Sequence, residues 1–539
     1  MPKWKTLWIL AFILLIGAVL RFLGLGSSEL LFDEGLYALR SIGYLDYLDA
    51  AAQPTPVEWL ANQDLPWWTS LSFHDHPPLI FLIQHLSFKL FGDSLFAARL
   101  PSAIFGILSI LLVYLIALRI TNLNKLRIPN SFALIAAALF SISFAAVGVS
   151  RLAMMESVLF FFILLNIYFF LRFLEDKKYW FFFGASLGLA FLTKYTAIFL
   201  IPAYLIFLLA AKSPLLKSKY LYASIFAAIL LFSPVIIYNI YFYSAFGHFD
   251  LQFATLLRQK TPFWQGESGK TQEPFSNILE NALAIYSTPL LVAIVFGAAV
   301  SVFVQNRQNR LLLLFLLFQT LMFLPMGSAI RFISLYIISG VFAATLGFKW
   351  IWEKFGSKFA FPAVFLVFVF ELMLTLNLAF FNAPDYGVVQ LDKYFDLVLG
   401  EGRSAATPTH PNQHLDKIIK QYAAYFPETL PPTGIIYDEN IDSGAKLWLF
   451  SRRQFYRGIP IMPAADFEEK LKNGKGAMFE GYELYFVKAG PGAPLIPARP
   501  MPYAGEVENL LLDYGKTKPD FTAKSGDGEP AFNVYKFSL

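Results

Sequence analysis

The sequence predicts a polytopic α-helical membrane protein that ends in a soluble α/β domain. Of its 539 residues, 57% are hydrophobic and only 15% are charged, a balance that soluble globular proteins do not show. Apolar runs of membrane-spanning length recur as far as residue 381, and the composition turns polar from Asn382. These observations divide the chain into a transmembrane domain, residues 1–381, and a C-terminal domain, residues 382–539.

The apolar runs predict about 11 to 13 transmembrane helices. The first run, from Leu7 to Leu25, follows Lys3 and Lys5 but lacks a small-residue cleavage site, so we expect a transmembrane helix and not a signal peptide. The other runs lie near residues 95–118, 132–149, 157–174, 179–194, 196–211, 220–243, 284–304, 311–327, 331–348 and 360–381.

Basic residues fall in alternate connections between these runs. They are Arg119, Lys125, Arg127, Arg172, Lys177, Lys178, Lys212, Lys217, Lys219, Arg307, Arg310, Lys349, Lys354 and Lys358. By the positive-inside rule, these loops and the N-terminus are cytoplasmic. The loops 26–94 and 244–283 and the C-terminal domain are then extracytoplasmic, and the protein is an integral component of the plasma or cytoplasmic membrane.

The C-terminal domain shows both strand and helix patterns. TGIIYDEN, YELYFVKAG and FNVYKFSL predict strands, and SGAKLWLFSRRQFY and DFEEKLKNG predict helices. The chain has no cysteine, which excludes disulfides, thiolate catalysis and Cys-zinc sites. The net charge of +5 is modest, and we expect no nucleic-acid partner.

Two adjacent carboxylates, Asp33 and Glu34, follow the first span. Acids beside hydrocarbon are costly, so they are usually retained where a polar site needs them. A partly desolvated carboxylate also gains basicity, which suits a general base that accepts a proton from a hydroxyl acceptor. Simple solvation of the membrane interface is the alternative explanation.

A second group of candidates lies in SFHDHPP, residues 72–78. His74, Asp75 and His76, together with His248 from a later outer loop, could hold a divalent metal ion, although His-x-His alone is a weak metal pattern. This metal is the only cofactor that the residues suggest. The Pro77–Pro78 pair should end the extended segment and start an amphipathic helix.

The remaining candidates are charged residues near span ends. Arg151 and Glu156 lie at an outer junction between two spans, where a salt bridge between them is the structural alternative. Lys194 lies between two short apolar runs, so its side chain either snorkels or binds an anion such as a phosphate. Arg258 adds a basic group in the outer loop 244–283.

The order of these motifs resembles a known family. DE at 33–34, DHPP at 75–78, ARLPSAIFG at 98–106, SR followed by Glu156, and GLAFLTK at 188–194 resemble the dolichyl-phosphate-mannose-protein mannosyltransferase and aminoarabinose (lipid A) transferase family of the GT-C superfamily. The resemblance covers roughly residues 7–210. Aminoarabinose transferases often carry EKPP where this chain has DHPP, so His76 replaces a phosphate-binding lysine.

The resemblance implies a GT-C-like fold and a membrane glycosyltransferase. Such an enzyme moves a hexosyl or pentosyl group, with inversion, from a polyprenyl-phosphate-linked donor to a hydroxyl of a protein, lipid or glycan at the outer face. The family assigns the catalytic base to the acid that matches Asp33, with Glu34 beside it. We expect donor-phosphate contacts from Lys194, Arg258 and Arg151, and a supporting loop from Asp75, His76 and Glu156.

Two other classes of function fit parts of the sequence. A transporter or flippase of lipid-linked sugars would also have many spans and polar groups, but it is typically built from internal repeats, and the sequence shows none. A binding domain on a membrane anchor would not need so many spans. The concentration of polar residues in the outer loops favours chemistry at one face of the membrane.

Overall fold

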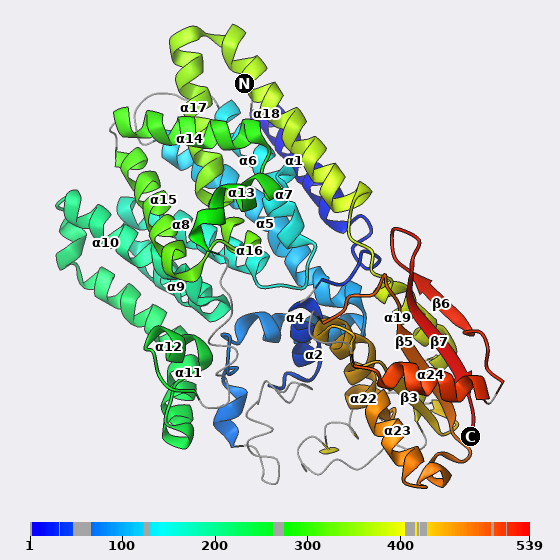
Figure 1. Cartoon of the computed structure of the whole chain (residues 1–539). Coiled ribbons are helices and arrows are strands. Elements are labelled where there is room, and N and C mark those ends of the chain that lie inside the picture. The colour runs from blue at the N-terminus through cyan, green and yellow to red at the C-terminus, as the bar shows by residue number, and fades with distance from the viewer. Residues whose placement is uncertain are drawn as a thin grey trace. The chain divides into compact units, whose positions relative to one another are not determined.

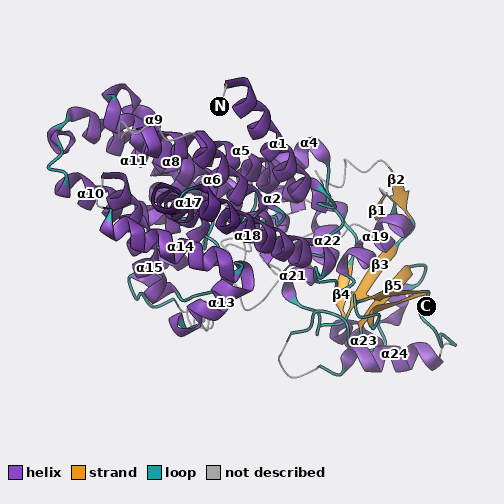
Figure 2. Cartoon of the chain, turned by 90° about the horizontal axis from the view of Figure 1, so that it is seen from above, coloured by secondary structure: helices purple, strands orange, loops and turns teal. Residues whose placement is uncertain are grey.

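The computed structural model of the chain forms two compact units. It describes residues 3–31, 33–46, 66–122, 130–261, 274–304, 307–400, 402–404, 416–417, 420, 428–496, 501–513 and 515–539. The membrane unit comprises Met1–Gly26 and Leu71–Ala383, and the C-terminal unit comprises Ser27–Ser70 and Pro384–Leu539. Figure 1 traces both units along the chain, and Figure 2 shows that the strands belong to the C-terminal unit.

The membrane unit is helical, and each predicted run coincides with one helix or with two consecutive helices. The helices are α1 (Lys3–Phe22), α4 (Leu79–Phe91), α5 (Leu95–Asn122), α6 (Asn130–Ile142), α7 (Phe144–Ser150), α8 (Glu156–Glu175), α9 (Trp180–Thr193), α10 (Leu200–Ala210), α11 (Lys219–Phe246), α12 (Leu251–Leu256), α13 (Ile278–Ile285), α14 (Thr288–Phe303), α15 (Arg307–Met326), α16 (Ile330–Ile333), α17 (Tyr336–Phe355) and α18 (Ser357–Leu376).

The number of full-length spans is smaller than predicted. Six of the described helices are long and apolar enough to cross a membrane, and the bent pair α6 and α7 would make a seventh. The helices α9, α10 and α14 have only 14, 11 and 16 residues. At 1.5 Å per residue, 14 residues extend about 21 Å, which is less than the hydrocarbon thickness of about 30 Å.

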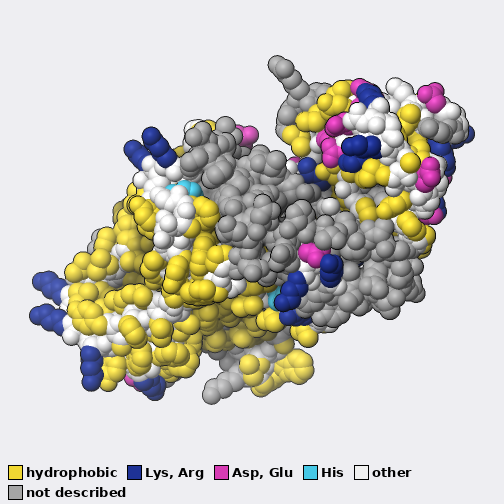
Figure 3. Space-filling view, turned by 90° about the horizontal axis from the view of Figure 1, so that it is seen from below, with side chains coloured by type: hydrophobic (Ala, Val, Ile, Leu, Met, Phe, Trp, Pro, Cys, Tyr) yellow, Lys and Arg dark blue, Asp and Glu magenta, His cyan; other side chains and the backbone are white. Residues whose placement is uncertain are grey.

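Three of the loops that were predicted to be cytoplasmic lie at the same end of the helix bundle. Arg119 at the end of α5 forms an ion pair with Glu175 at the end of α8. Phe132 at the start of α6 packs edge-on against Trp352 near the end of α17, with ring centroids 6.3 Å apart. Figure 3 shows a broad hydrophobic surface over the membrane unit, with Lys and Arg side chains gathered at its rim.

A buried carboxylate stabilises the bend between α6 and α7. Glu371 of α18 accepts hydrogen bonds from Ser143 Oγ at 2.7 Å and from the backbone N–H of Phe144 at 3.3 Å. It also accepts one from the backbone N–H of Ser287, at 2.9 Å. The axes of α6 and α7 differ by 53°. Glu371 therefore satisfies backbone donors at the starts of α7 and α14, which have no partner within their own helices.

The C-terminal unit contains a five-stranded mixed sheet in the order β4-β3-β5-β7-β6. The strands are β3 (Thr433–Tyr437), β4 (Ile461–Pro463), β5 (Glu483–Ala489), β6 (Phe521–Lys524) and β7 (Pro530–Phe537), and β1 (Gly402–Ser404) pairs separately with β2 (Glu428–Leu430). The helices are α19 (Val388–Leu399), α21 (Ser443–Lys446), α22 (Arg452–Arg457), α23 (Ala464–Lys472) and α24 (Tyr503–Asp513), with a π-helical segment, η8 (Leu447–Ser451), between α21 and α22. The five predicted elements and the C-terminal α/β class are confirmed.

The loop after the first span, residues 26–94, is divided between the units. Its helix α2 (Asp33–Gly43) belongs to the C-terminal unit, whereas the loop from Leu71 onward belongs to the membrane unit. The sequence-based division assigns all of residues 1–381 to one domain. The difference arises because the backbone of α2 packs closely against residues 443–457, a long-range contact that local sequence patterns do not encode.

Candidate functional site

Charged side chains meet at one end of the membrane unit. Glu156 is the first residue of α8, and Lys194 lies at the break after α9. Lys194 Nζ is 2.5 Å from Glu156 Oε1, and both side chains are buried. Arg331 of the short helix α16 also acts electrostatically on Glu156. The alternative pairing of Glu156 with Arg151 is therefore wrong, because Lys194 occupies that position.

Arg151 instead holds the C-terminal end of the first span. Its Nη1 donates to the backbone carbonyls of Leu20 at 3.0 Å and Leu23 at 2.7 Å. Its guanidinium also lies 4.6 Å from the centre of the Phe380 ring. A cation at the carbonyl end of a helix is stabilising. The structure thus shows a helix-capping role for Arg151, and phosphate contact remains a prediction for it.

The DHPP segment joins this end of the membrane unit. His76 Nδ1 lies 2.8 Å from Asp75 Oδ2, and the carbonyl of His74 accepts a hydrogen bond of 2.7 Å from the backbone N–H of Leu251. As the proline pair predicts, α4 begins at Leu79, directly after Pro78. The segment is therefore fixed both to α4 and to the start of α12.

Asp250 is a buried acid that the sequence analysis missed. It accepts hydrogen bonds from the Tyr195 hydroxyl at 2.9 Å, from Asn239 Nδ2 at 3.0 Å and from the backbone N–H of Phe253 at 2.9 Å. Burial raises its pKa to about 6, and the charge of Asp75 acts in the same direction. Tyr195, which donates to Asp250, directly follows Lys194, which pairs with Glu156. Asp250 is therefore linked through Tyr195 to the ion pair of Lys194 and Glu156. Asp250 is the N-cap residue of α12. Because Asp is a preferred N-cap residue, its position before an apolar helical segment was a sequence signal that could have identified it.

Two other candidates, His248 and Arg258, lie in the loop 244–283. The Nδ1 atom of buried His248 is 2.8 Å from the carbonyl oxygen of Phe249. Arg258 is exposed and has a positive φ of 53°. Among the described residues, no three His, Asp or Glu side chains form a group that could hold a metal ion. A divalent metal held by His74, Asp75 and His248 stays a prediction.

The two acids that follow the first span have different surroundings in the C-terminal unit. Glu34 is fully buried, and its Oε2 accepts a hydrogen bond of 2.9 Å from the backbone N–H of Leu31. Asp33 is only partly buried and is the first residue of α2. The helix dipole favours negative charge at this position. Asp33 is thus the more accessible of the two carboxylates.

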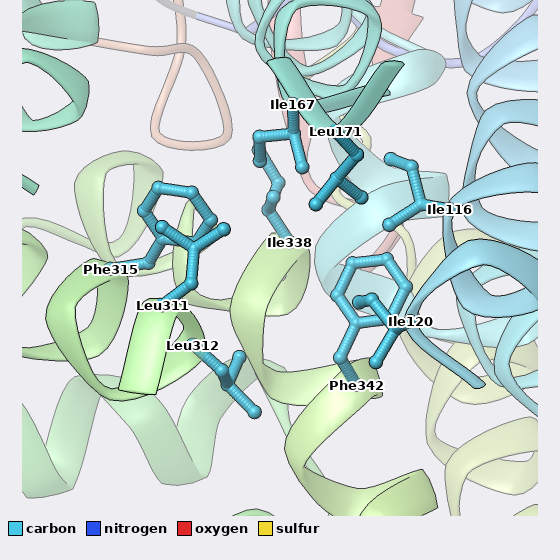
Figure 4. A pocket seen from close by; sticks show the side chains of 9 residues that line it. All are labelled: Ile116, Ile120, Ile167, Leu171, Leu311, Leu312, Phe315, Ile338 and Phe342. Atoms are coloured by element: carbon cyan, nitrogen blue, oxygen red, sulfur yellow. The ribbon is translucent and has the colours of Figure 1, made fainter. Parts of the chain in front are cut away.

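An apolar pocket lies deeper in the membrane unit. Nine aliphatic and aromatic side chains of α5, α8, α15 and α17 line it, among them Ile116, Ile167, Phe315 and Phe342 (Figure 4). Ile167 follows Glu156 by eleven positions on α8, which corresponds to about 16 Å along the helix. The lining is entirely apolar, so the pocket offers no group for acid–base chemistry.

Comparisons with known sequences support the resemblance in the first half of the chain. The sequence profile of the family described as Dolichyl-phosphate-mannose-protein mannosyltransferase matches residues 75–238. The chain is 35% identical over 149 residues to an uncharacterized protein of Aquifex aeolicus, covering 27% of this chain and 29% of that protein. It is 31% identical over 173 residues to the Bacillus subtilis protein named "Putative mannosyltransferase YkcB", covering 31% of this chain and 23% of that protein. The matches thus span less than a third of either relative.

Comparisons with solved structures identify the fold over nearly the whole chain. The oligosaccharyltransferase of Archaeoglobus fulgidus aligns with a TM-score of 0.57 at 14% identity, covering 90% of this chain and 70% of that chain. ArnT of Cupriavidus metallidurans, solved with bound undecaprenyl phosphate, aligns with a TM-score of 0.56 at 12% identity. The alignment covers 99% of this chain and 98% of that chain. The chain shares its fold with these two transferases. The family profile agrees with the predicted resemblance over residues 75–238.

Arg331 is the second residue of this site that the sequence analysis missed. It lies in the connection between α15 and α17, within the otherwise apolar stretch SAIRFISLY. A lone arginine between two apolar runs at a predicted outer end was an available signal, since such charges usually mark a polar site. Only the tertiary structure shows that its charge reaches Glu156.

Proposed function

We propose that the protein is a glycosyltransferase that moves a sugar from a polyprenyl-phosphate-linked donor to a hydroxyl acceptor at the outer face of the membrane. The observation that carries this proposal is the concentration of charged groups, Glu156, Lys194 and Arg331, at one end of a largely apolar helical bundle that shares its fold with ArnT. ArnT, which shares this fold, was solved with undecaprenyl phosphate, and the Archaeoglobus enzyme was solved in complex with a dolichol-phosphate.

Lys194 is the group that we assign to the donor phosphate, with Arg258 and Arg151 as the further basic candidates. An ammonium has three N–H donors, so Lys194 can contact Glu156 and a phosphate oxygen at the same time. Arg331 adds positive charge to the same group of residues. These cations would stabilise the phosphate as it leaves with the bonding electrons of the anomeric carbon–oxygen bond.

Asp33 is the group that we assign as general base. It would accept the proton of the acceptor hydroxyl while that oxygen forms a bond to the anomeric carbon and polyprenyl phosphate departs. A single displacement of this kind inverts the anomeric configuration. The leaving phosphate is already an anion, so the reaction requires little help from a general acid. Glu34 is assigned to holding the start of α2, since it binds the backbone of Leu31.

The direct test uses the purified full-length protein in lipid bilayers. It is incubated with a panel of polyprenyl-phosphate hexoses and pentoses and with hydroxyl acceptors, and the release of polyprenyl phosphate is measured. We expect release with at least one sugar, dependent on acceptor. Movement of intact donor across the bilayer without release would instead identify a flippase, and neither activity with any donor would refute the proposal.

A further inference from the structure

The helix that carries Asp33 is built into the C-terminal unit. The loop after the first span forms α2, whose residues from Glu34 to Ile42 are almost all buried. The partners of this helix lie more than 400 positions later in the chain, in the continuous helical run of α21, η8 and α22. The position of the proposed base is therefore determined by residues of the C-terminal unit.

A backbone-to-backbone contact locks the first turn of α2. A Cβ atom placed on Gly35 would lie 2.2 Å from the carbonyl oxygen of Gly444 and 3.0 Å from its carbonyl carbon. No side chain fits in that space, because the neighbouring atoms belong to the backbone and cannot rotate away. Asp442 caps the partner helix by accepting a hydrogen bond of 2.9 Å from the N–H of Gly444. The contact lies only two positions from Asp33.

A hydrogen bond fixes the last turn of the same helix. The Tyr456 hydroxyl of α22 donates to the carbonyl of Leu39 at 2.7 Å, and Tyr456 is buried. A Cβ atom on Gly43 would lie 2.7 Å from this hydroxyl oxygen, so the close approach depends on glycine there as well. With both ends fixed, α2 can neither slide nor rotate without breaking one of these contacts.

The partner helix is itself anchored by charged residues. Asp392 of α19 accepts from Arg452 Nη2 at 2.6 Å and from Trp448 Nε1 at 2.9 Å, and Arg453 Nη2 lies 2.8 Å from it. Burial alone would raise the pKa of Asp392, but the two arginines lower it below its usual value. Glu29, shortly before α2, caps the start of α19 by accepting from the backbone N–H groups of Tyr386 and Val388.

We propose that Gly35, Gly444 and Tyr456 are positioning residues that hold Asp33 in its reactive orientation, and that this is a function of the C-terminal unit. The inference rests on the proposed role of Asp33 as general base. Misplacement of a reacting group by about 1 Å can cost on the order of 100-fold in rate. Small changes at this contact should therefore slow transfer while leaving donor binding intact.

The experiment uses two variants and a matched control in the full-length protein. Gly35→Ala forces α2 away from Gly444, and Tyr456→Phe removes only the hydroxyl. Gly505→Ala in α24 is the control, because a Cβ there meets no atom within 4 Å. We expect single-turnover transfer to fall about 10- to 100-fold in Gly35→Ala and several-fold in Tyr456→Phe. The affinity for polyprenyl phosphate should stay within about twofold of wild type, and Gly505→Ala should transfer normally.

Combination with Asp33→Asn separates positioning from general damage. If the contact acts through Asp33, Gly35→Ala and Tyr456→Phe should change the residual rate of Asp33→Asn by less than about twofold. An equal fold-loss in both backgrounds would overturn the proposal, as would full activity of both single variants. If Gly35→Ala does not fold, the transfer rates of Tyr456→Phe in the wild-type and Asp33→Asn backgrounds decide between these outcomes. Full activity of Asp33→Asn would instead refute the proposed base itself.

Discussion

At the scale of single residues, the two carboxylates that follow the first span have different environments. Glu34 is buried and bound to the backbone of Leu31, whereas Asp33 is partly exposed at the start of α2. Adjacent acids can therefore have separate tasks. Glu34 stabilises the local structure, and Asp33 is the carboxylate that we assign to proton transfer.

Asp33→Asn should insert and fold normally but lose sugar transfer. The amide keeps the shape and the hydrogen-bonding capacity of the side chain but cannot accept the acceptor proton, and removal of a general base costs about 10²- to 10⁴-fold in rate. Transfer is measured as acceptor-dependent release of polyprenyl phosphate. Glu34→Gln is the matched control and should lose less activity. If Glu34→Gln were inactive and Asp33→Asn active, the two roles would be reversed.

Lys194 and Glu156 allow a test that separates structural from chemical importance. Lys194→Met leaves the buried carboxylate of Glu156 without its ammonium partner, which typically costs about 3–5 kcal/mol of stability. The double variant Lys194→Met/Glu156→Gln removes both charges and should regain most of that stability in thermal unfolding. We expect its transfer rate to stay low, because the phosphate contact is still missing. A double variant with wild-type turnover would show that Lys194 is only the structural partner of Glu156.

At the scale of secondary-structure elements, breaks in the helices place the polar residues. Lys194 lies at the break between α9 and the 3-10 turn Tyr195–Phe199, so a change in the helical backbone and a charged side chain coincide. The other break, between α6 and α7, depends on Glu371. A carboxylate of this kind joins helices because it accepts hydrogen bonds from the first backbone N–H groups of a helix, which have no partner within that helix.

Glu371→Ala should destabilise the bundle strongly. It leaves Ser143 Oγ and the N–H groups of Phe144 and Ser287 without this acceptor, and each unsatisfied buried donor costs about 1–3 kcal/mol. Thermal unfolding in detergent measures the loss. Glu353→Ala provides the control, because that half-exposed side chain pairs with Lys349 at 3.6 Å and should contribute less than about 1 kcal/mol. Equal stability of the two variants would argue against the joining role of Glu371.

At the scale of the whole molecule, the distribution of basic loops predicts the orientation in the membrane. Reporter fusions after Lys178 and at the C-terminus should report opposite sides, with Lys178 cytoplasmic, because the positive-inside rule assigns the loop of Lys177 and Lys178 to the cytoplasm. The reporters are an enzyme active only outside and a fluorescent protein active only inside. Signals from the same side would contradict the predicted topology and the outer location of the reaction.

The sequence by itself determined the helices of the membrane unit, the α/β class of the C-terminal unit and the family resemblance. Apolar runs, prolines and alternating strands are local signals, so α8, the start of α4 and β5 all lie close to the predicted positions. Composition also indicated Asp33 and Lys194 as candidates, because charged groups near hydrocarbon are rare and costly.

Only the tertiary structure decided which of these groups meet. The pairing of Lys194 with Glu156, the capping role of Arg151 and the buried Asp250 depend on contacts between helices distant in the sequence. The same holds for α2, whose Gly35 packs against Gly444 in the C-terminal unit. Hydrophobic patterning specifies which segments are buried but not their partners, since close packing between particular backbones arises only when the whole chain has folded.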